Sequence, residues 1–203
     1  MSEGRLFVIS GPSGVGKGTI VNEIMSSASA VKLSISATTR NPREGEIDGK
    51  SYFFLSEADF EAKIADDGFL EYAYVHGNYY GTPKKPVIDA LKKGFDVILE
   101  IDVQGAMQVK SSYKDATYIF VLPPSMEQLE TRIRTRGTES EEDISLRLGK
   151  ALEEIRCLNE YDYYVINDVL ELAIHETEAI MKAEHCKISD ASMLIAEYEE
   201  EFK

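Results

Sequence analysis

The sequence predicts an α/β protein with a parallel sheet flanked by helices and a small, mostly β insertion. Two observations support this fold class. Short apolar runs typical of buried strands alternate with segments whose apolar residues recur at helical spacing. Region 34–83 interrupts this alternation with polar loops, turns and short extended runs. In a parallel sheet, ligands bind at the carboxyl ends of the strands, so functional residues are expected there.

Length and composition limit the class of protein. A chain of 203 residues, 43% hydrophobic and 29% charged, suits one globular domain, or one core that carries small inserted subdomains. No apolar run approaches the roughly 20 residues that span a bilayer, and no signal-peptide segment precedes the first strand. Cys157 and Cys186 lie far apart, which favours reduced thiols and a cytoplasmic location.

The net charge of −14 argues against a general nucleic-acid binder, because such a protein needs a basic face. The arginines are nevertheless clustered. Six of the eight fall in two short regions: Arg40, Arg43, Arg132, Arg134, Arg136 and Arg147. An acidic chain that gathers its guanidinium groups in this way is predicted to hold a focused site for a polyanion. For Arg134, a solvated helix charge is the alternative interpretation.

The chain begins with a strand, a glycine-rich loop and a helix. The apolar run 6–9 predicts a buried strand, and from Ile20 the apolar spacing becomes helical. The loop between them consists of Gly11, Pro12, Ser13, Gly14, Val15, Gly16, Lys17, Gly18 and Thr19. Glycines let successive backbone N–H groups turn toward an anion, and the helix N-terminus adds a favourable dipole. Lys17 supplies a mobile charge for β- and γ-phosphates.

This loop matches the P-loop pattern Gly-x4-Gly-Lys-Ser/Thr except at its last position. Gly18 stands where the pattern has Ser or Thr, and Thr19 follows one place later. Without a hydroxyl at position 18, we expect Mg²⁺ to be held mainly by phosphates and water. No direct protein ligand for the metal is therefore assigned, although Thr19 and Glu100 are candidates for nearby groups.

The next segments form the insertion. Alternating apolar and polar residues predict a half-exposed strand over 31–37, and a polar loop follows as far as Glu46. The remaining elements of the insertion are, in order, a strand at 52–55, a helix capped by Ser56 and ended by Gly68, an extended run at 69–72 and turns at 76–81.

The second half of the chain returns to buried strands and helices. In order, it predicts a helix at about 84–93, strands at 95–102 and 118–122, a helix from Ser125 to about Arg136, a longer helix opened at Ser140, a strand at 163–166 and a helix at about 170–184. The apolar stripe 144–155 is interpreted as core or lid packing. From Ile188 the tail is acidic.

Taken together, these motifs resemble the guanylate kinases over about residues 5–185. Besides the P-loop, the resemblance rests on Ser36-Ala-Thr-Thr-Arg-Asn-Pro-Arg43-x-Gly-Glu46, Gly77-Asn-Tyr-Tyr-Gly81, Leu99-Glu-Ile-Asp-Val-Gln-Gly105, Arg136-Gly-Thr-Glu139 and Val165-Ile-Asn-Asp168. It implies ATP-dependent phosphorylation of GMP, and of dGMP, to the diphosphate in purine nucleotide metabolism and GMP recycling. Mg²⁺ is the implied cofactor.

The resemblance also implies three parts within one domain at 4–185. They are a P-loop core at about 4–33, 84–124 and 159–185, a GMP-binding subdomain at about 34–83, and a helical lid at about 125–158, with an acidic extension at 186–203. The implied partners are the small molecules ATP and GMP, with no nucleic acid and no membrane. The oligomeric state is left open between monomer and homodimer.

By the same resemblance, carboxylates and hydroxyls read the guanine base. Guanine presents N1–H and a 2-amino group side by side, so one carboxylate can accept both, whereas adenine presents a lone pair at N1. Glu71 is expected to be that carboxylate, aided by Asp102, and the hydroxyls of Ser36 and Thr82 are expected to serve O6. A site of buried polar groups rejects a mismatched base because its own groups lose their partners.

The resemblance assigns the acceptor phosphate to guanidinium and phenol groups. Arg40, Arg43, Tyr52 and Tyr80 match the GMP-phosphate clamp of the family. The planar fork of arginine suits the oxygens of a phosphate better than the ammonium of lysine does.

The transfer itself needs in-line positioning and charge neutralisation rather than covalent chemistry. Lys17 and the loop amides are expected to hold the donor phosphates, while Arg136 and Arg147 close over them from the lid, with Arg132 as a helper. Arg40 is expected to touch the transferring group. Mounting arginines on a moving lid excludes water before chemistry begins.

Two further residues complete the expected site. Glu100 is counted with the GMP-binding residues and is the candidate for orienting the water ligands of Mg²⁺, where many family members have Asp. Asn167 is expected to contact adenine loosely. The histidines form no ligand cluster and are interpreted as non-catalytic.

Two rival functions are weighed against this one. A guanylate-kinase-like scaffold would bind a protein through the insertion, but such a scaffold is expected to lose the P-loop lysine or the lid arginines, which this chain keeps. Another nucleoside monophosphate kinase is suggested by Gly-Lys-Gly-Thr, but the pair Glu71 and Asp102 favours guanine.

Overall fold

The computed structural model describes residues 3–135, 140–188 and 192–202. Its centre is a five-stranded sheet in the order β2-β7-β1-β8-β9, and every pairing in it is parallel. The strands are β1 (Leu6–Ser10), β2 (Val31–Leu33), β7 (Asp96–Glu100), β8 (Ala116–Leu122) and β9 (Tyr163–Ile166). The parallel α/β core predicted from the sequence is confirmed.

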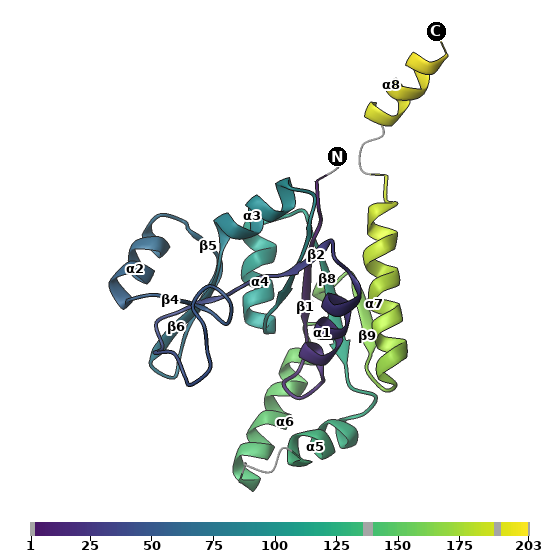
Figure 1. Cartoon of the computed structure of the whole chain (residues 1–203). Coiled ribbons are helices and arrows are strands. Elements are labelled where there is room, and N and C mark those ends of the chain that lie inside the picture. The colour runs from purple at the N-terminus through teal and green to yellow at the C-terminus, as the bar shows by residue number, and fades with distance from the viewer. Residues whose placement is uncertain (1–2, 136–139, 189–191, 203) are drawn as a thin grey trace.

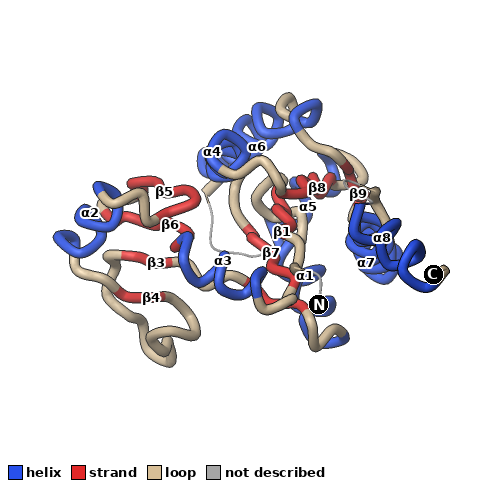
Figure 2. Tube along the Cα trace, turned by 90° about the horizontal axis from the view of Figure 1, so that it is seen from above, coloured by secondary structure: helices blue, strands red, loops and turns tan. Residues whose placement is uncertain are grey.

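Helices cover both faces of this sheet (Figures 1 and 2). Consecutive side chains of a strand point to opposite faces, so β1 supplies both layers. Phe7 and Ile9 pack with α1 (Lys17–Ser27) and α7 (Leu170–His185). On the other face, the cluster that contains Leu6 and Val8 joins α3 (Lys84–Lys92) and α4 (Val103–Ser112). Each fully buried aliphatic side chain contributes roughly 1.5–3 kcal/mol to folding.

A second, four-stranded sheet stands beside the core (Figure 1). It has the order β4-β3-β6-β5 and is covered by α2; the elements are β3 (Ala37–Thr38), β4 (Phe53–Phe54), α2 (Glu57–Ala65), β5 (Phe69–Val75) and β6 (Asn78–Pro83). Its small core is aromatic, since Phe60 of α2 stacks on Phe69 and Tyr79 with ring centroids 4.3 and 5.1 Å apart. The small, mostly β insertion is thus confirmed.

Two helices lie at the end of the main sheet where β1 and β8 finish (Figure 1). They are α5 (Met126–Thr135) and α6 (Glu141–Ile155). Ser140 begins α6 with a reciprocal capping box, in which its hydroxyl accepts from the Asp143 N–H and the Asp143 carboxylate accepts from the Ser140 N–H. A 3₁₀ turn, Leu158–Glu160, then leads to β9, and the last element is α8 (Ser192–Glu201).

The sequence-based expectations differ from the structure in four places. The strand expected over 31–37 is two strands in different sheets, because the chain leaves the main sheet after Leu33 and enters the small sheet at Ala37. The segment 76–81 is a turn at His76 and Gly77 followed by β6. Helix α4 was not predicted, and neither was α8.

None of the described helices is long and apolar enough to cross a bilayer.

Candidate functional site

The glycine-rich loop adopts backbone angles that side chains disfavour. Gly11, Gly14 and Gly16 have φ values of 141°, 89° and 99°. Gly16 is the N-cap of α1, and a Cβ atom on it would lie 2.4 Å from the Asn167 side-chain nitrogen. Glycine is therefore required at position 16 both by the left-handed φ and by the lack of space.

The ammonium of Lys17 lies inside the curve of this loop. Its Nζ donates to the carbonyl oxygens of Gly11 at 2.7 Å and Pro12 at 3.2 Å. The positive charge is thus held where the backbone N–H groups and the N-terminus of α1 also favour an anion.

Arg132 and Asn167 support the loop from behind. The Asn167 side-chain nitrogen donates to Val15 O at 2.8 Å, and Arg132 donates to Val15 O at 3.3 Å and to Asn167 O at 2.8 Å. Asn167 is only 7% exposed. Both side chains therefore fix the loop backbone; the adenine contact expected of Asn167 stays a prediction.

A cleft of about 290 Å³ opens beside the loop. It is lined by Gly11, Ser13, Lys17, Glu100, Ile101, Asp102, Arg147, Lys150 and Glu154. Three elements meet here: the P-loop after β1, the end of β7, and one face of α6. Since β1 and β7 are parallel neighbours, with Ile9 opposite Glu100, their carboxyl ends necessarily lie together.

Glu100 faces the first turn of α1. A Cβ atom at Gly18 would lie 3.3 Å from Glu100 Oε1, so the glycine leaves room for this carboxylate. Burial raises the pKa of Glu100, and the positive charge of Lys17 opposes that rise. Thr19 is exposed on the same turn. Among the described residues, no group of three or more His, Cys, Asp or Glu side chains could hold a metal ion alone.

Glu71, Thr82 and Asp102 converge across the junction of the two sheets. The Thr82 hydroxyl donates to Glu71 Oε1 at 2.6 Å, and a Cβ atom at Gly105 would lie 3.1 Å from Glu71 Oε2. Asp102 caps α4 by accepting from the Gly105 N–H at 2.9 Å. Burial raises the pKa of Glu71; the Thr82 hydrogen bond opposes this rise, and the Asp102 charge adds to it.

The arginine loop is organised by an acid that sequence reasoning left without a role. Glu46 accepts from the Arg40 guanidinium at 2.8 Å and from the Arg43 N–H at 2.7 Å. These bonds hold the pKa of Glu46 below its usual range. Arg40 also lies 5.5 Å from the Tyr52 ring, whose centroid is 6.2 Å from that of Tyr80. The structure thus groups these expected clamp residues, while Ser36 lies at the crossing between the sheets, where its carbonyl accepts from Phe53 N.

Helix α6 contributes more to the cleft than its expected arginine. Lys150 and Glu154 lie on the cleft-facing side of α6 with Arg147. Lys150 Nζ is 3.9 Å from Glu154 Oε1. The spacing i, i+3, i+7 is the sequence signal that could have found them. Arg134 instead forms ion pairs with Glu130 at 2.7 Å and Glu141 at 2.5 Å. These exposed pairs agree with the alternative interpretation of Arg134 as a solvated charge on a helix surface. Arg136 lies outside the described residues, so its role stays a prediction.

Comparisons with known proteins converge on one family. The guanylate kinase family model matches residues 3–184. The chain is similar to a guanylate kinase of Clostridium tetani, with 54% identity over 93% of this chain and 90% of the relative. It is 51% identical to one of Caldanaerobacter subterraneus subsp. tengcongensis over 98% and 97% of the two chains. The crystal structure of guanylate kinase from Anaplasma phagocytophilum superposes with a TM-score of 0.71 at 33% identity, covering 92% and 88%.

Proposed function

The chain belongs to the guanylate kinase family and phosphorylates GMP to GDP with ATP, and from this premise we propose which of its residues carry the reaction. The family uses ATP with a divalent metal. The observation that carries the proposal is that two groups of residues converge at one place. Lys17, Glu100 and Arg147 line the same cleft as Asp102. Asp102 in turn accepts from the N–H of Gly105, and Gly105 packs against the Glu71 carboxylate.

Glu71 is proposed to read guanine by accepting from N1–H and the 2-amino group. The Thr82 hydrogen bond and the packing against Gly105 support this role, because they fix the carboxylate within the site. Asp102 assists from the adjacent N-cap, and Ser36 and Thr82 serve O6. These groups face the base rather than the sugar, so dGMP is proposed as a second acceptor.

Arg40, Arg43, Tyr52 and Tyr80 are proposed to clamp the GMP phosphate. Glu46 supports this role by holding the Arg40 guanidinium and the backbone of Arg43. Arg40 already lies against the Tyr52 ring, so the charged fork is oriented before a phosphate binds. In this proposal 34–83 is the GMP-binding subdomain and 125–158 the lid.

Lys17 and the loop amides are proposed to hold the donor phosphates, with Arg147 and Arg136 neutralising charge during transfer. Arg132 and Asn167 act by keeping the loop in shape. The metal is proposed to be Mg²⁺, which would neutralise phosphate charge when bound. One half-buried carboxylate beside Gly18 fits an ion that keeps most of its ligands as water and phosphate, so Glu100 is the residue proposed to orient that water.

The substitution Glu71→Gln tests this assignment. Hydrogen bonds to a charged group contribute about 1.5–3 kcal/mol, so we expect kcat/KM for GMP to fall by about 10- to 100-fold. Binding of ATP, measured by calorimetry, should be unchanged. The matched control is Glu61→Gln on the exposed side of α2. Unchanged GMP turnover in Glu71→Gln would show that base recognition lies elsewhere.

A cytoplasmic location is also proposed, since the two cysteines are free thiols.

A further inference from the structure

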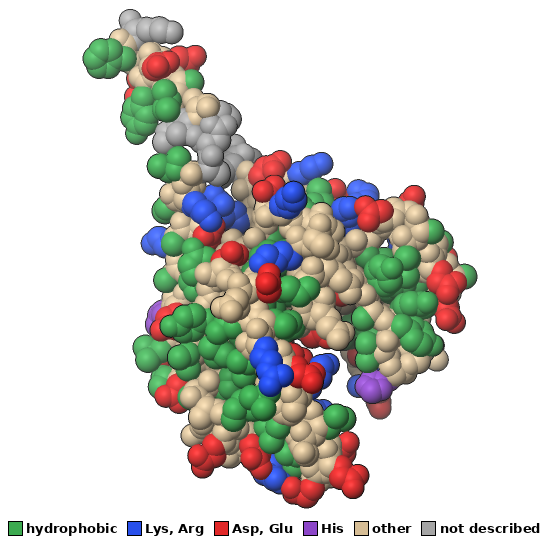
Figure 3. Space-filling view, turned by 180° about the vertical axis from the view of Figure 1, so that it is seen from behind, with side chains coloured by type: hydrophobic (Ala, Val, Ile, Leu, Met, Phe, Trp, Pro, Cys, Tyr) green, Lys and Arg blue, Asp and Glu red, His purple; other side chains and the backbone are tan. Residues whose placement is uncertain are grey.

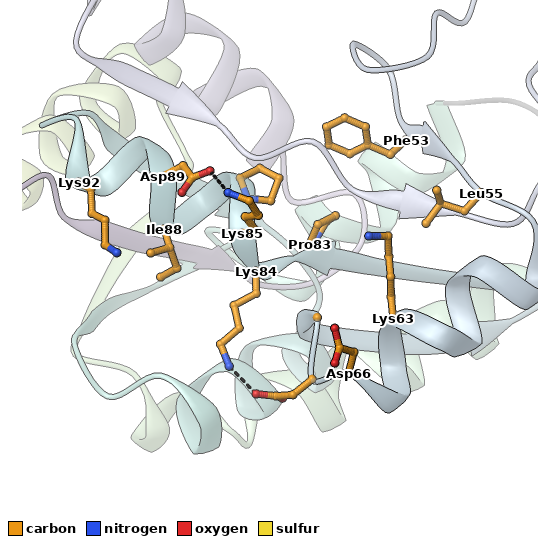
Figure 4. A pocket seen from close by; sticks show the side chains of 13 residues that line it. Phe53, Leu55, Lys63, Asp66, Pro83, Lys84, Lys85, Ile88, Asp89 and Lys92 are labelled. Carbon is orange, nitrogen blue, oxygen red and sulfur yellow. Dashed lines mark hydrogen bonds and ion pairs between the residues drawn. The ribbon is translucent and has the colours of Figure 1, made fainter.

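A groove outside the catalytic cleft separates α2 from α3 (Figure 4). It encloses about 910 Å³ and shares no residue with the cleft. Its apolar lining is Phe53, Leu55, Pro83, Pro86 and Ile88, and its basic lining is Lys63, Lys84, Lys85 and Lys92. A groove of this kind suits a ligand that has an apolar face bordered by acids. We call it the lysine groove.

The four lysines of the lysine groove differ in their counter-ions. Lys84 pairs with Asp67 at 2.6 Å and Lys85 with Asp89 at 2.7 Å, as the dashed lines in Figure 4 mark. Within the described part of the chain, neither Lys63 nor Lys92 forms an ion pair. Asp66, Asp67 and Asp89 also line the groove, so its four lysines exceed its aspartates by one positive charge, and Lys63 and Lys92 are the lysines left without a direct ion pair among the described residues.

Helix α8 has the complementary surface. It stands clear of the body, with apolar and acidic side chains exposed (Figures 1 and 3). Ile195, Tyr198 and Phe202 are 55%, 67% and 96% exposed and recur at i, i+3 and i+7, so they form one stripe. At 3.6 residues per turn, Glu199 and Glu201 border that stripe on its two sides. A helix of ten residues is not stable alone in water, so α8 needs a surface to pack on.

The end of α7, from which the chain continues to α8, lies near one end of the groove. His185, the last residue of α7, has its Nε2 2.8 Å from Asp96 Oδ2, and Asp96 follows the groove residue Lys92 by four positions. The six residues between His185 and Ser192 can span about 20 Å. Helix α8 is about 15 Å long, nearly the length of α3, which forms one wall of the groove.

We propose that α8 docks in the lysine groove of its own chain. The stripe Ile195, Tyr198 and Phe202 covers the apolar floor, and the bordering glutamates pair with Lys63 and Lys92. Since the groove lies between α2 of the small sheet and α3 of the core, the docked helix bridges the two. The acidic tail thereby becomes a strap across their junction.

Lysine labelling of the full chain tests this docking. Rates of acetylation by N-hydroxysuccinimide acetate are measured by mass spectrometry at Lys63 and Lys92, with the exposed Lys50 as an internal reference. In the double variant E199K/E201K, we expect both groove lysines to react several-fold faster than in the wild type, with Lys50 unchanged. The matched control is E197K/E200K, which makes the same charge change on the opposite side of α8 and should leave the rates unchanged.

Equal labelling rates in all three proteins would overturn the proposal, and so would equal acceleration in both variants. A dilution series decides between one chain and two, because docking within a chain gives wild-type rates independent of protein concentration. Loss of protection on dilution would show that a second copy occupies the groove, which also contradicts the proposal. Unchanged GMP kinase activity in both variants shows that they are folded, since no altered residue lines the cleft.

Discussion

At the scale of single residues, Glu71 shows a conflict between folding and function. Burial raises the pKa of its carboxyl, so its ionised form is disfavoured in the folded protein relative to the unfolded chain. The same burial removes water that would compete with guanine. The residue that is proposed to select the base is therefore one that weakens the free protein.

This conflict predicts a pH-dependent gain in stability for Glu71→Gln. An acid with a raised pKa binds more protons folded than unfolded, so its destabilising effect grows as pH rises from its ordinary value of 4.5 through the folded value and is complete above it. The melting temperature of the ligand-free variant should be a few degrees higher than that of the wild type near neutral pH. The difference should shrink toward about pH 4. A difference independent of pH would show that the buried charge of Glu71 is not its cause.

A second residue-scale prediction concerns Lys150. Because it lines the cleft one turn from Arg147, we expect it to exchange Glu154 for a phosphate when the donor binds. Lys150→Gln should raise KM for ATP about tenfold, equivalent to about 1.4 kcal/mol, with little change in KM for GMP. Steady-state kinetics with Lys114→Gln, an exposed lysine outside the cleft, provides the control. An equal rise in both KM values would mean a general structural effect.

At the scale of elements, two glycines with opposite surroundings give a matched pair. In Gly16→Ala the new methyl group meets the Asn167 side chain at 2.4 Å in a backbone with φ of 99°, so the loop must change shape. We expect ATP binding, followed by calorimetry, to be lost. In Gly149→Ala the methyl group meets nothing within 4 Å inside α6, and replacing a helical glycine stabilises by roughly 0.5–1 kcal/mol. Retained ATP affinity in Gly16→Ala would contradict the loop geometry.

The cap of α6 gives a further prediction for an element. The Ser140 hydroxyl accepts a hydrogen bond from a backbone N–H in the first turn of α6, the helix that carries Arg147 and Lys150. Ser140→Ala should lower the free energy of unfolding by about 1 kcal/mol, measured by urea denaturation, because a helix N–H loses its partner. Ser140→Asp keeps an acceptor and should retain most of the stability. Equal losses in both variants would show that the cap contributes nothing.

Local signals decided which elements the sequence could predict. Apolar runs and capping residues predicted β1, β7, β8, α2 and α6, because each of these signals is contained within a few consecutive residues. Helix α4 was missed because its segment contains Gly105 and little apolar periodicity, and its N-cap Asp102 was interpreted only as a base-reading acid. The strand over 31–37 was split by tertiary pairing, since alternation looks the same whichever sheet the residues join.

The candidate site was predictable to the same degree. Glu100 ends β7, and Asp102 and Lys17 follow β7 and its parallel neighbour β1, so the fold class alone brings these residues to one edge of the sheet. Lys150 and Glu154 were missed, although their i+3 and i+7 spacing from Arg147 places them on the same face of α6. Glu46 was within the matched motif, but its contacts with Arg40 and the Arg43 backbone depend on the fold of the loop.

At the scale of the whole molecule, the core and α6 line one cleft, and the small sheet meets the core beside it, where Glu71 lies against Gly105. The core supplies Lys17 and Glu100, the small sheet supplies Glu71 and Thr82, and α6 supplies Arg147. In the proposed site, neither base reading nor phosphate binding is complete within one of these parts. We therefore attribute specificity for the acceptor to the small sheet together with the end of β7, and the transfer chemistry to the P-loop and lid.

The most direct test of guanine recognition is nucleoside-diphosphate production from ATP and Mg²⁺ with GMP, AMP, CMP and UMP in parallel, using the wild type and Glu71→Gln. We predict strong turnover of GMP by the wild type, with the other three near background, and selective loss of GMP turnover in the variant. Equal turnover of GMP and AMP by the wild type, or undiminished preference for GMP in the variant, would contradict the assignment of Glu71 and Asp102 as the groups that read guanine.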